Sequence, residues 1–109
     1  NIPKVITNEN NEMVYMSRSP LPATKNVSKK PNSYKRQVCI SAFTIEELQL
    51  FKNFGRKSYL ESYEDIELLR FLELNKKILM YECSISSIAV DIPSDIDKVE
   101  NYLDKKLCQ

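Results

Sequence analysis

The sequence lacks histidine altogether and contains a single glycine, Gly55, among its 109 residues. Histidine is the most frequent general acid or base in enzymes and a common metal ligand, so its absence excludes the usual catalytic arrangements built on imidazole. One glycine cannot build a glycine-rich loop that cradles phosphates. If the chain takes part in nucleotide chemistry, we expect the phosphate-binding residues to lie in another part of the protein.

Cysteine is also scarce, because only Cys39, Cys83 and Cys108 are present and they are far apart in the sequence. An odd number of cysteines without a C-x-x-C pair indicates neither a disulfide framework nor a zinc site. Reduced thiols in a cytoplasmic protein are the expectation. The sequence also lacks an apolar run of about 18 residues and a signal-type segment, so we expect neither membrane insertion nor export.

Neither sign of charge dominates, since 16 basic and 15 acidic side chains give a formal net charge of +1. This balance is not typical of proteins that bind nucleic acid or anionic membranes. Residues 23–36 are an exception, with five cations and no acid. They predict either a flap over an anionic ligand or, as is more common for charge runs, a solvated loop. Tyr34 is the only aromatic residue among them, which argues against nucleic-acid binding.

The local patterns predict both strands and helices. Residues 3–17 are expected to form a hairpin, because β-rich runs flank an asparagine-rich turn. Further strands are predicted at residues 37–43, 77–83 and 87–91. Helices are predicted at residues 44–54, at 62–75 and from Ser94 onward.

The start and the end of the first helix have specific signals. Thr44 and Glu47 form a capping box, and Gly55 provides the stop. The last helix is expected to begin at a similar pair, Ser94 and Asp97. The strands and helices alternate, which predicts an α/β layer fold. The sheet is incomplete, because few of these strands can neighbour each other through standard crossovers.

Asp91 is the most informative candidate site residue, because it stands at the C-terminal end of a short apolar strand. Pro93 cannot donate a ladder hydrogen bond and disfavours helix at the preceding residue, so the strand is expected to end near Asp91. Ligands of open α/β sheets bind just beyond the carboxyl ends of strands. Asp91 is therefore a candidate metal or substrate ligand; the alternative is an ordinary turn residue before proline.

Four stretches of the sequence resemble one family, in the right order: residues 17–20, 34–43, 65–73 and 87–95. The family is the CMP-sugar synthetases, specifically the 3-deoxy-manno-octulosonate (KDO) cytidylyltransferases. The resemblance covers nearly all of this chain but only the C-terminal part of that enzyme. It implies that residues 1–109 are the sugar-binding and dimerisation portion of a doubly wound α/β nucleotidyltransferase domain.

The resemblance also implies a reaction and partners. The enzyme couples CTP to a sugar acid, KDO or a similar one, and gives a CMP-sugar and pyrophosphate for surface polysaccharide synthesis. It works as a cytoplasmic homodimer with Mg²⁺ as cofactor, without nucleic acid or membrane. The CTP-binding part is N-terminal and absent from this chain, so residues 1–109 alone are expected to be inactive.

The resemblance assigns roles to individual residues. Asp91 matches the metal aspartate, which suits Mg²⁺ because this ion takes one or two carboxylates together with phosphate oxygens. Arg18 matches the arginine that binds the sugar acid, and a guanidinium fork recognises a carboxylate bidentately. Glu67 matches an acid that accepts hydrogen bonds from sugar hydroxyls. The alternative for Glu67 is an ion pair with Arg70 on an exposed helix face.

Three positions depart from the family pattern. Gln37 and Ser41 stand where the KDO enzymes usually have histidine and tyrosine, and Leu68 replaces a common glutamine. Gln37 and Ser41 remain candidate sugar contacts, but the departures leave open a sialic-acid-type (nonulosonate) substrate. A non-catalytic α/β interaction module is the other alternative. A part of a larger sheet should expose apolar surface, whereas a free-standing module should not.

Overall fold

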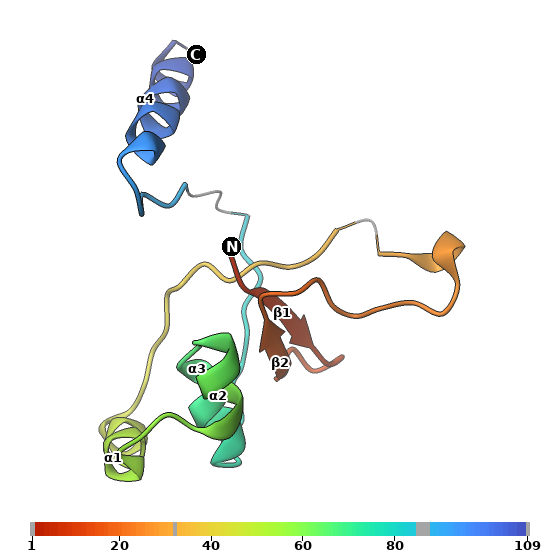
Figure 1. Cartoon of the computed structure of the whole chain (residues 1–109), viewed down its shortest axis with the longest axis vertical. Coiled ribbons are helices and arrows are strands. Elements are labelled where there is room, and N and C mark those ends of the chain that lie inside the picture. Colours follow the sequence, from red (N-terminus) through yellow and green to blue (C-terminus); the bar gives the residue numbers. More distant parts are fainter. Residues whose placement is uncertain (1, 32, 85–87, 109) are drawn as a thin grey trace.

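The computed structural model describes residues 2–31, 33–84 and 88–108 (Figure 1). The chain is open in shape, because its radius of gyration is 16.8 Å and its extents are 48 × 39 × 25 Å. A compact domain of this length is expected to have a radius of gyration of about 13 Å. The elements therefore leave much of their surface uncovered by the rest of the chain.

An antiparallel hairpin is the first element, as the sequence predicts. Strand β1 (Lys4–Thr7) pairs with β2 (Met13–Ser17), with Val5 opposite Met16. The turn depends on Asn8, whose side-chain Oδ1 accepts hydrogen bonds from the backbone N–H groups of Asn10 and Glu12 at 2.9 and 3.0 Å. Asparagine suits this place because its side chain can replace backbone partners in a tight turn.

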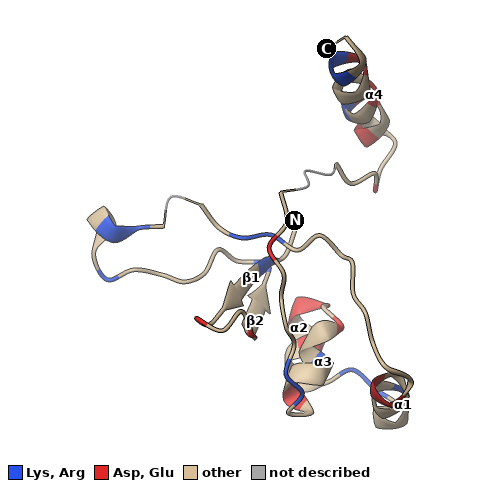
Figure 2. Cartoon of the chain, turned by 180° about the vertical axis from the view of Figure 1, so that it is seen from behind, with Lys and Arg blue, Asp and Glu red and all other residues tan. Residues whose placement is uncertain are grey.

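A long loop follows the hairpin and projects away from the helices. It contains a short 3-10 helix, η1 (Val27–Lys29), and most of the cationic stretch predicted from the sequence. Figure 2 shows the ribbon coloured blue at basic positions around η1, and Lys25, Lys29 and Lys30 are exposed. At its other end, Lys35 forms an ion pair with Glu82 at 3.1 Å.

The prediction of strands at residues 37–43 and 77–83 is wrong, because neither segment forms a strand in the structure. The structure forms isolated bridges, Lys4 with Arg36 and Glu12 with Leu79. Short backbone pairings flank the hairpin on both sides, including Val5 N–H to Lys35 O at 2.9 Å and Met13 N–H to Ile78 O at 2.8 Å. The pairing stops there because a ladder needs a neighbouring strand, and no such neighbour lies in the described part of the chain beside residues 38–43 or 81–84.

Cys39 adds a second interruption in the first of these segments. Its φ angle is +64°, in the left-handed region that strands do not use. The third predicted strand, 87–91, is only partly testable because Ser87 lies outside the described residues. Residues 88–91 do not form a strand. Residues 37–43, 77–83 and 88–91 run as extended or irregular chain.

Helix α1 (Ile45–Phe54) begins and ends where the sequence predicts. Thr44 Oγ1 accepts from the Glu47 N–H at 3.2 Å, and Glu47 Oε2 accepts from the Thr44 N–H at 2.8 Å. Gly55 ends the helix with a φ of +70°. A capping box and a left-handed glycine satisfy the backbone groups that a helix leaves unpaired at its ends.

The single helix predicted at 62–75 is wrong, because the structure has two shorter helices there. Helix α2 (Tyr59–Glu64) ends at Asp65, whose φ is +55°, and α3 (Leu68–Glu73) follows. Ile66, Leu68, Leu69 and Phe71 of this region are buried. The core of the described chain combines the hairpin with these helices and consists of Val5, Met13, Met16, Ile66, Leu68, Leu69 and Phe71.

Helix α4 (Ser94–Leu107) stands apart from this core (Figure 1). The predicted Ser94–Asp97 capping box does not form. Asp95 Oδ2 instead accepts from the backbone N–H groups of Asp91 and Ile92, both at 3.2 Å. Pro93 occupies the N-cap position and has no N–H of its own to satisfy. No described helix is long and apolar enough to cross a membrane.

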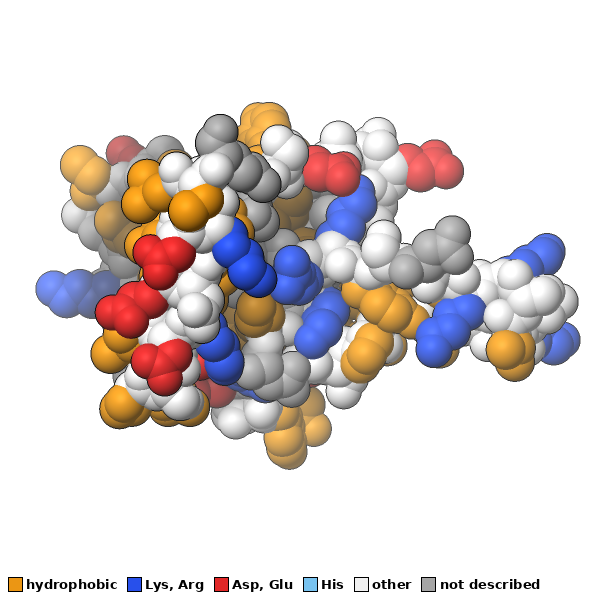
Figure 3. All heavy atoms as spheres, turned by 90° about the horizontal axis from the view of Figure 1, so that it is seen from above, with side chains coloured by type: hydrophobic (Ala, Val, Ile, Leu, Met, Phe, Trp, Pro, Cys, Tyr) orange, Lys and Arg blue, Asp and Glu red, His pale blue; other side chains and the backbone are white. Residues whose placement is uncertain are grey.

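Large apolar side chains are exposed on β2, η1, α1, α2 and α4, and Figure 3 shows several such side chains on one face of the molecule. On α4 they lie at helical spacing, and Leu107 is 83% exposed. Other exposed apolar side chains include Ile40, Ile45, Leu79, Val90 and Ile92. Contiguous exposed apolar surface is typical of faces that are covered by something else. The described cysteines are exposed and unpaired.

Candidate functional site

The site is centred on the junction between the end of β2 and the break between α2 and α3. Glu64, the last residue of α2, carries a carboxylate that accepts three hydrogen bonds from the β2 side. Oε1 accepts from Ser17 Oγ at 2.9 Å and from Tyr15 OH at 3.2 Å. Oε2 accepts from the backbone N–H of Arg18 at 2.9 Å. The Arg18 N–H is the largest cause that lowers the pKa of Glu64 below its usual value.

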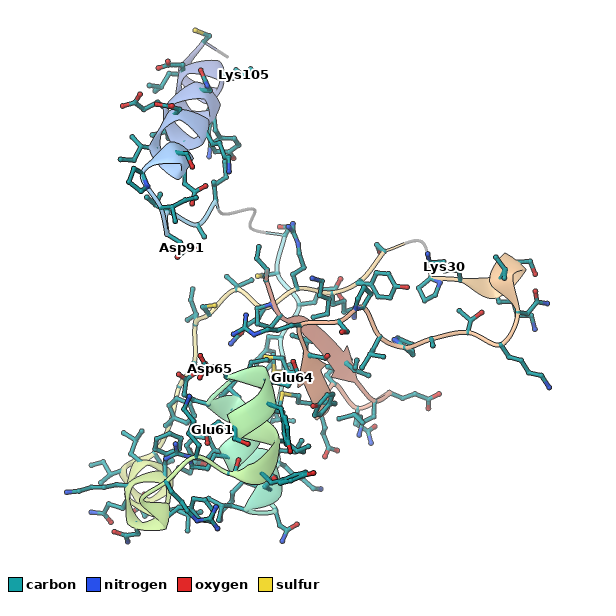
Figure 4. All side chains as sticks on the ribbon, viewed as in Figure 1. Lys30, Glu61, Glu64, Asp65, Asp91 and Lys105 are labelled. Atoms are coloured by element: carbon teal, nitrogen blue, oxygen red, sulfur yellow. The ribbon has the colours of Figure 1, made fainter. Side chains whose placement is uncertain are left out.

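Arg18 is half-buried, and its guanidinium lies against the backbone of the same break. Nε donates to the main-chain oxygen of Glu64 at 2.6 Å, and Nη2 donates to the main-chain oxygen of Asp65 at 3.2 Å. The left-handed conformation of Asp65 ends the helix there, so these carbonyls are not used by a following turn of α2. The structure therefore places Arg18 at the α2–α3 break (Figure 4, where Glu64 and Asp65 are labelled).

Glu67 lies two residues beyond Asp65 and is exposed. The predicted alternative, an ion pair between Glu67 and Arg70, is wrong. Arg70 instead forms a bidentate pair with Glu61, in which Nε and Nη2 each donate to a carboxylate oxygen at 2.7 Å. The Arg18–Asp65 bond thus joins Arg18, which is 47 residues distant in sequence, to the segment that leads to Glu67.

The Glu61–Arg70 pair lies beneath this surface and joins three helices. Glu61 is 1% exposed, and the Arg70 side chain is 11% exposed. The Arg70 guanidinium lies 3.6 Å from the ring centroid of Phe51 on α1, so the pair also links α1 to the other two helices. Arg70 lowers the pKa of Glu61, and Glu61 raises the pKa of Arg70, because each charge stabilises the other.

Gln37 and Ser41 lie on the extended segment that follows the cationic loop. Gln37 is half-buried, and its backbone N–H donates to Pro3 O at 3.0 Å. Ser41 is exposed. No hydrogen bond within the described ranges connects either side chain to Glu67. The third departure from the family pattern, Leu68, is 8% exposed and belongs to the core, so its side chain is not available to a ligand.

Asp91 lies just before α4, away from Glu64 and Asp65 (Figure 4). Its carboxylate is exposed, and its backbone N–H is bound by Asp95. The described residues contain no group of three or more His, Cys, Asp and Glu side chains that could hold a metal ion. A single exposed carboxylate still fits Mg²⁺, which keeps several waters and takes only one or two protein carboxylates. The structure does not bring Asp91 to Arg18.

A cavity of about 150 Å³ lies elsewhere, beside β1. Its lining includes Val5, Lys35, Arg36, Met80 and Tyr81, and it contains none of the five residues assigned from the sequence. This cavity is thus separate from the junction around Arg18. The polar contacts, rather than this cavity, define the candidate site.

Comparisons with known proteins show what this chain is similar to. No protein-family model matches the chain. The 3-deoxy-manno-octulosonate cytidylyltransferase of Christiangramia forsetii is 37% identical over 100 residues, which cover 92% of this chain and 40% of that protein. The enzyme of the same name from Chloroherpeton thalassium is 36% identical over 107 residues, covering 98% and 43%. A solved structure of CMP:2-keto-3-deoxy-manno-octonic acid synthetase complexed with CTP superposes with a TM-score of 0.83 at 28% identity, covering 96% of this chain and 42% of that one.

The chain matches a C-terminal part of the 3-deoxy-manno-octulosonate cytidylyltransferases. The family resemblance seen in the sequence is thereby confirmed. The α/β fold class is confirmed as well, because the described chain superposes on part of the CMP:2-keto-3-deoxy-manno-octonic acid synthetase structure. The chain spans about two fifths of the length of these cytidylyltransferases.

Sequence reasoning missed two carboxylates that build the junction, Glu61 and Glu64. One signal could have drawn attention to Glu64. A negative charge at the C-terminal end of a helix is opposed by the helix dipole, so an acid there is expected to have a separate stabilising partner. The partners come from Tyr15, Ser17 and Arg18, which precede Glu64 by 46 to 49 residues.

Proposed function

We propose that this chain is the sugar-side part of a cytidylyltransferase that couples CTP to KDO. The main support is the match to KDO cytidylyltransferases over almost the whole chain, together with hydrogen bonds that hold the candidate carboxylate-binding residue Arg18 against Glu64 and Asp65. In the reaction, the anomeric hydroxyl oxygen of the sugar forms a bond to the α-phosphorus of CTP. The bond from this phosphorus to the bridging oxygen breaks, pyrophosphate leaves, and the hydroxyl proton is released.

In this proposal the residues of the chain bind and orient the sugar acid. Arg18 binds the carboxylate of KDO, because a planar guanidinium with several donors matches the two carboxylate oxygens. Glu67 accepts hydrogen bonds from sugar hydroxyls, whereas Gln37 and Ser41 can both accept hydrogen bonds from them and donate hydrogen bonds to them. Asp91 is the candidate ligand of Mg²⁺, an ion that supplies charge neutralisation at transferring phosphates when it is bound.

The CTP-binding residues are proposed to lie outside residues 1–109. Two observations support this proposal: the chain spans about two fifths of its relatives, and apolar side chains are exposed on α1, on α4 and on the extended segments. Such surface is expected on a part of a larger α/β fold that packs against further layers or against a second subunit. We include a homodimer and a cytoplasmic location in the proposal; exposed thiols are compatible with a reducing compartment.

The exposed apolar surface also separates this proposal from the non-catalytic interaction module. A free-standing module is expected to cover its apolar faces, whereas this chain leaves residues such as Ile45, Ile92 and Leu107 exposed. Sedimentation of residues 1–109 tests the difference. We expect concentration-dependent association; a stable monomer that binds no hydrophobic dye would favour the module.

The identity of the sugar acid is tested in the enzyme that contains this chain. CMP-sugar formation is measured with CTP, Mg²⁺ and either KDO or N-acetylneuraminic acid. We expect turnover with KDO, and Arg18→Lys should raise the KM for KDO more than the KM for CTP, since lysine keeps the charge but loses the bidentate fork. Turnover with N-acetylneuraminic acid instead would favour the nonulosonate alternative. A lack of turnover with either acid would reject the proposed function.

A further inference from the structure

We propose that Glu64 is a positioning residue that fixes the guanidinium of Arg18 for the sugar-acid carboxylate. This inference rests on the proposed function, because it concerns the residue to which that function assigns carboxylate binding. No catalytic step is assigned to Glu64 itself.

Glu64 binds Arg18 both at its backbone N–H and at its guanidinium group. The carboxylate Oε2 accepts the backbone N–H of Arg18 at 2.9 Å, and the main-chain oxygen of Glu64 accepts Nε–H at 2.6 Å. A bond to Nε restricts rotation of the guanidinium plane, while a bond to the backbone N–H fixes the point from which the side chain starts. Together these two contacts set the direction of the guanidinium.

The other carboxylate oxygen ties the same residue to the preceding strand. Oε1 accepts from Ser17 Oγ and Tyr15 OH, and Ser17 is almost completely buried. Ser17 Oγ in turn accepts the backbone N–H of Ser19 at 3.0 Å. Glu64 therefore connects the chain on both sides of Arg18 to the end of α2, so a displacement of its carboxylate is transmitted directly to Arg18.

The arrangement requires an ionised carboxylate, because all three groups that face it are used as donors. The charged groups near it are Arg18 itself, the Lys57–Asp65 ion pair at the adjoining residue and, on the Tyr15 side, Glu73. The Arg18 N–H and the two hydroxyls offset the cost of placing a negative charge at a helix C-terminus. A glutamine can accept fewer of these bonds, since its amide nitrogen is only a donor.

Prior orientation of a binding group matters because ordering a long side chain on binding costs free energy. Immobilising a rotamer-rich side chain costs about 0.5–1.5 kcal/mol, and a bidentate contact tolerates little error in direction. An arginine that is already oriented avoids part of this cost. Loss of the Glu64 carboxylate should thus weaken binding of the acid and leave CTP binding unchanged.

The kinetic test compares Glu64→Gln with the matched exposed variant Glu100→Gln on α4, in the enzyme that contains this chain. We expect Glu64→Gln to raise the KM for KDO about tenfold, with the KM for CTP changed by less than about twofold, and Glu100→Gln to change neither. A factor of ten corresponds to about 1.4 kcal/mol, which is close to the contribution of the weakest hydrogen bonds to charged groups. An equal rise of both KM values would assign Glu64 a merely structural role and overturn the inference.

A spectroscopic test on residues 1–109 separates failure of the inference from failure of the proposed function. Solvent exchange of the Arg18 Nε–H is measured by ¹⁵N NMR in the wild type, in Glu64→Gln and in Glu64→Ala. The main-chain carbonyl that accepts Nε–H is present in all three, so faster exchange in the variants reports loss of positioning by the carboxylate. Unchanged exchange in a variant that remains folded would overturn the inference, whether or not KDO is a substrate. If Glu64→Ala does not fold, Glu64→Gln decides.

Discussion

Removing the charge of Glu61 is expected to destabilise the described core by about 3–5 kcal/mol. Arg70 donates two hydrogen bonds of 2.7 Å to the Glu61 carboxylate, and Glu61 also accepts the backbone N–H of Ser58 at 2.9 Å. Each hydrogen bond to a charged group contributes about 1.5–3 kcal/mol. Breaking a buried ion pair by removing one partner costs about 3–5 kcal/mol, because the other charge stays buried without compensation.

Urea unfolding of Glu61→Gln, followed by circular dichroism at 222 nm, measures this cost. With a slope of about 2 kcal/mol per molar urea, the midpoint should fall by about 2 M. A loss of about 3–5 kcal/mol is a large fraction of the 5–15 kcal/mol by which domains are typically stable. The Glu61→Gln variant is therefore expected to be partly unfolded without denaturant.

The exposed pair of Lys35 and Glu82 provides a matched control. Its side chains are 55% and 77% exposed, at an N–O distance of 3.1 Å. Surface pairs of this kind contribute about 0–1 kcal/mol, so Glu82→Gln should shift the midpoint by less than about 0.5 M. If Glu61→Gln had an equally small effect, the account of Glu61 and Arg70 as a buried pair that joins three helices would be refuted.

Three further outcomes are expected. The pKa values of Glu61 and Glu64 are lowered in the folded state, so both carboxylates contribute stability above about pH 4.5, the ordinary pKa of glutamate. This contribution is lost as the pH falls through the lowered pKa values. The stability of Glu64→Gln, measured by acid unfolding, should therefore depend less on pH than the stability of the wild type. Cys39→Gly should raise thermal stability by about 0.5–1 kcal/mol, because a φ of +64° suits glycine better than any side chain; a loss measured by calorimetry would contradict this. Asp91→Asn should lower Mg²⁺-dependent turnover of the enzyme that contains this chain at least tenfold, and unchanged turnover would remove Asp91 from the proposed metal site.

The elements that the sequence predicts correctly are those with local causes. The hairpin depends on Asn8 and its near neighbours, and α1 depends on Thr44, Glu47 and Gly55, all within a few residues of the ends that they define. Short-range hydrogen bonds of this kind form independently of the remaining chain. Their signals are therefore readable without the tertiary structure.

The elements that the sequence does not predict depend on partners. The apolar periodicity of residues 62–75 continues through Asp65, so a single left-handed residue that divides the helix leaves no trace in the pattern. Residues 37–43 have the composition of a buried strand, but a strand requires a neighbour to complete its ladder. Arg70 pairs with Glu61 rather than with Glu67 because α2 packs against α3. This packing between helices, and not the spacing in the sequence, decides which of the two acids Arg70 binds.

The residues of the candidate site also differ in whether the sequence alone identifies them. Arg18 and Glu67 are identified by resemblance to a family motif, and Asp91 also by its place after an apolar segment. Glu64 is identified only by bonds that span 46 to 49 residues. Arg18 is bonded to Glu64 and Asp65, and Asp91 lies away from these two residues (Figure 4). In our proposal, the surfaces that would bring Arg18 and Asp91 into one reaction belong to the CTP-binding part.

The most direct measurement of the central claim is ³¹P NMR of a mixture of CTP, Mg²⁺ and KDO with the enzyme that contains this chain. The account predicts that a CMP-sugar phosphodiester signal and pyrophosphate appear in equal amounts, and only when KDO is present. Unchanged CTP, or its hydrolysis at the same rate with and without KDO, would contradict the claim that this chain forms the sugar side of a cytidylyltransferase.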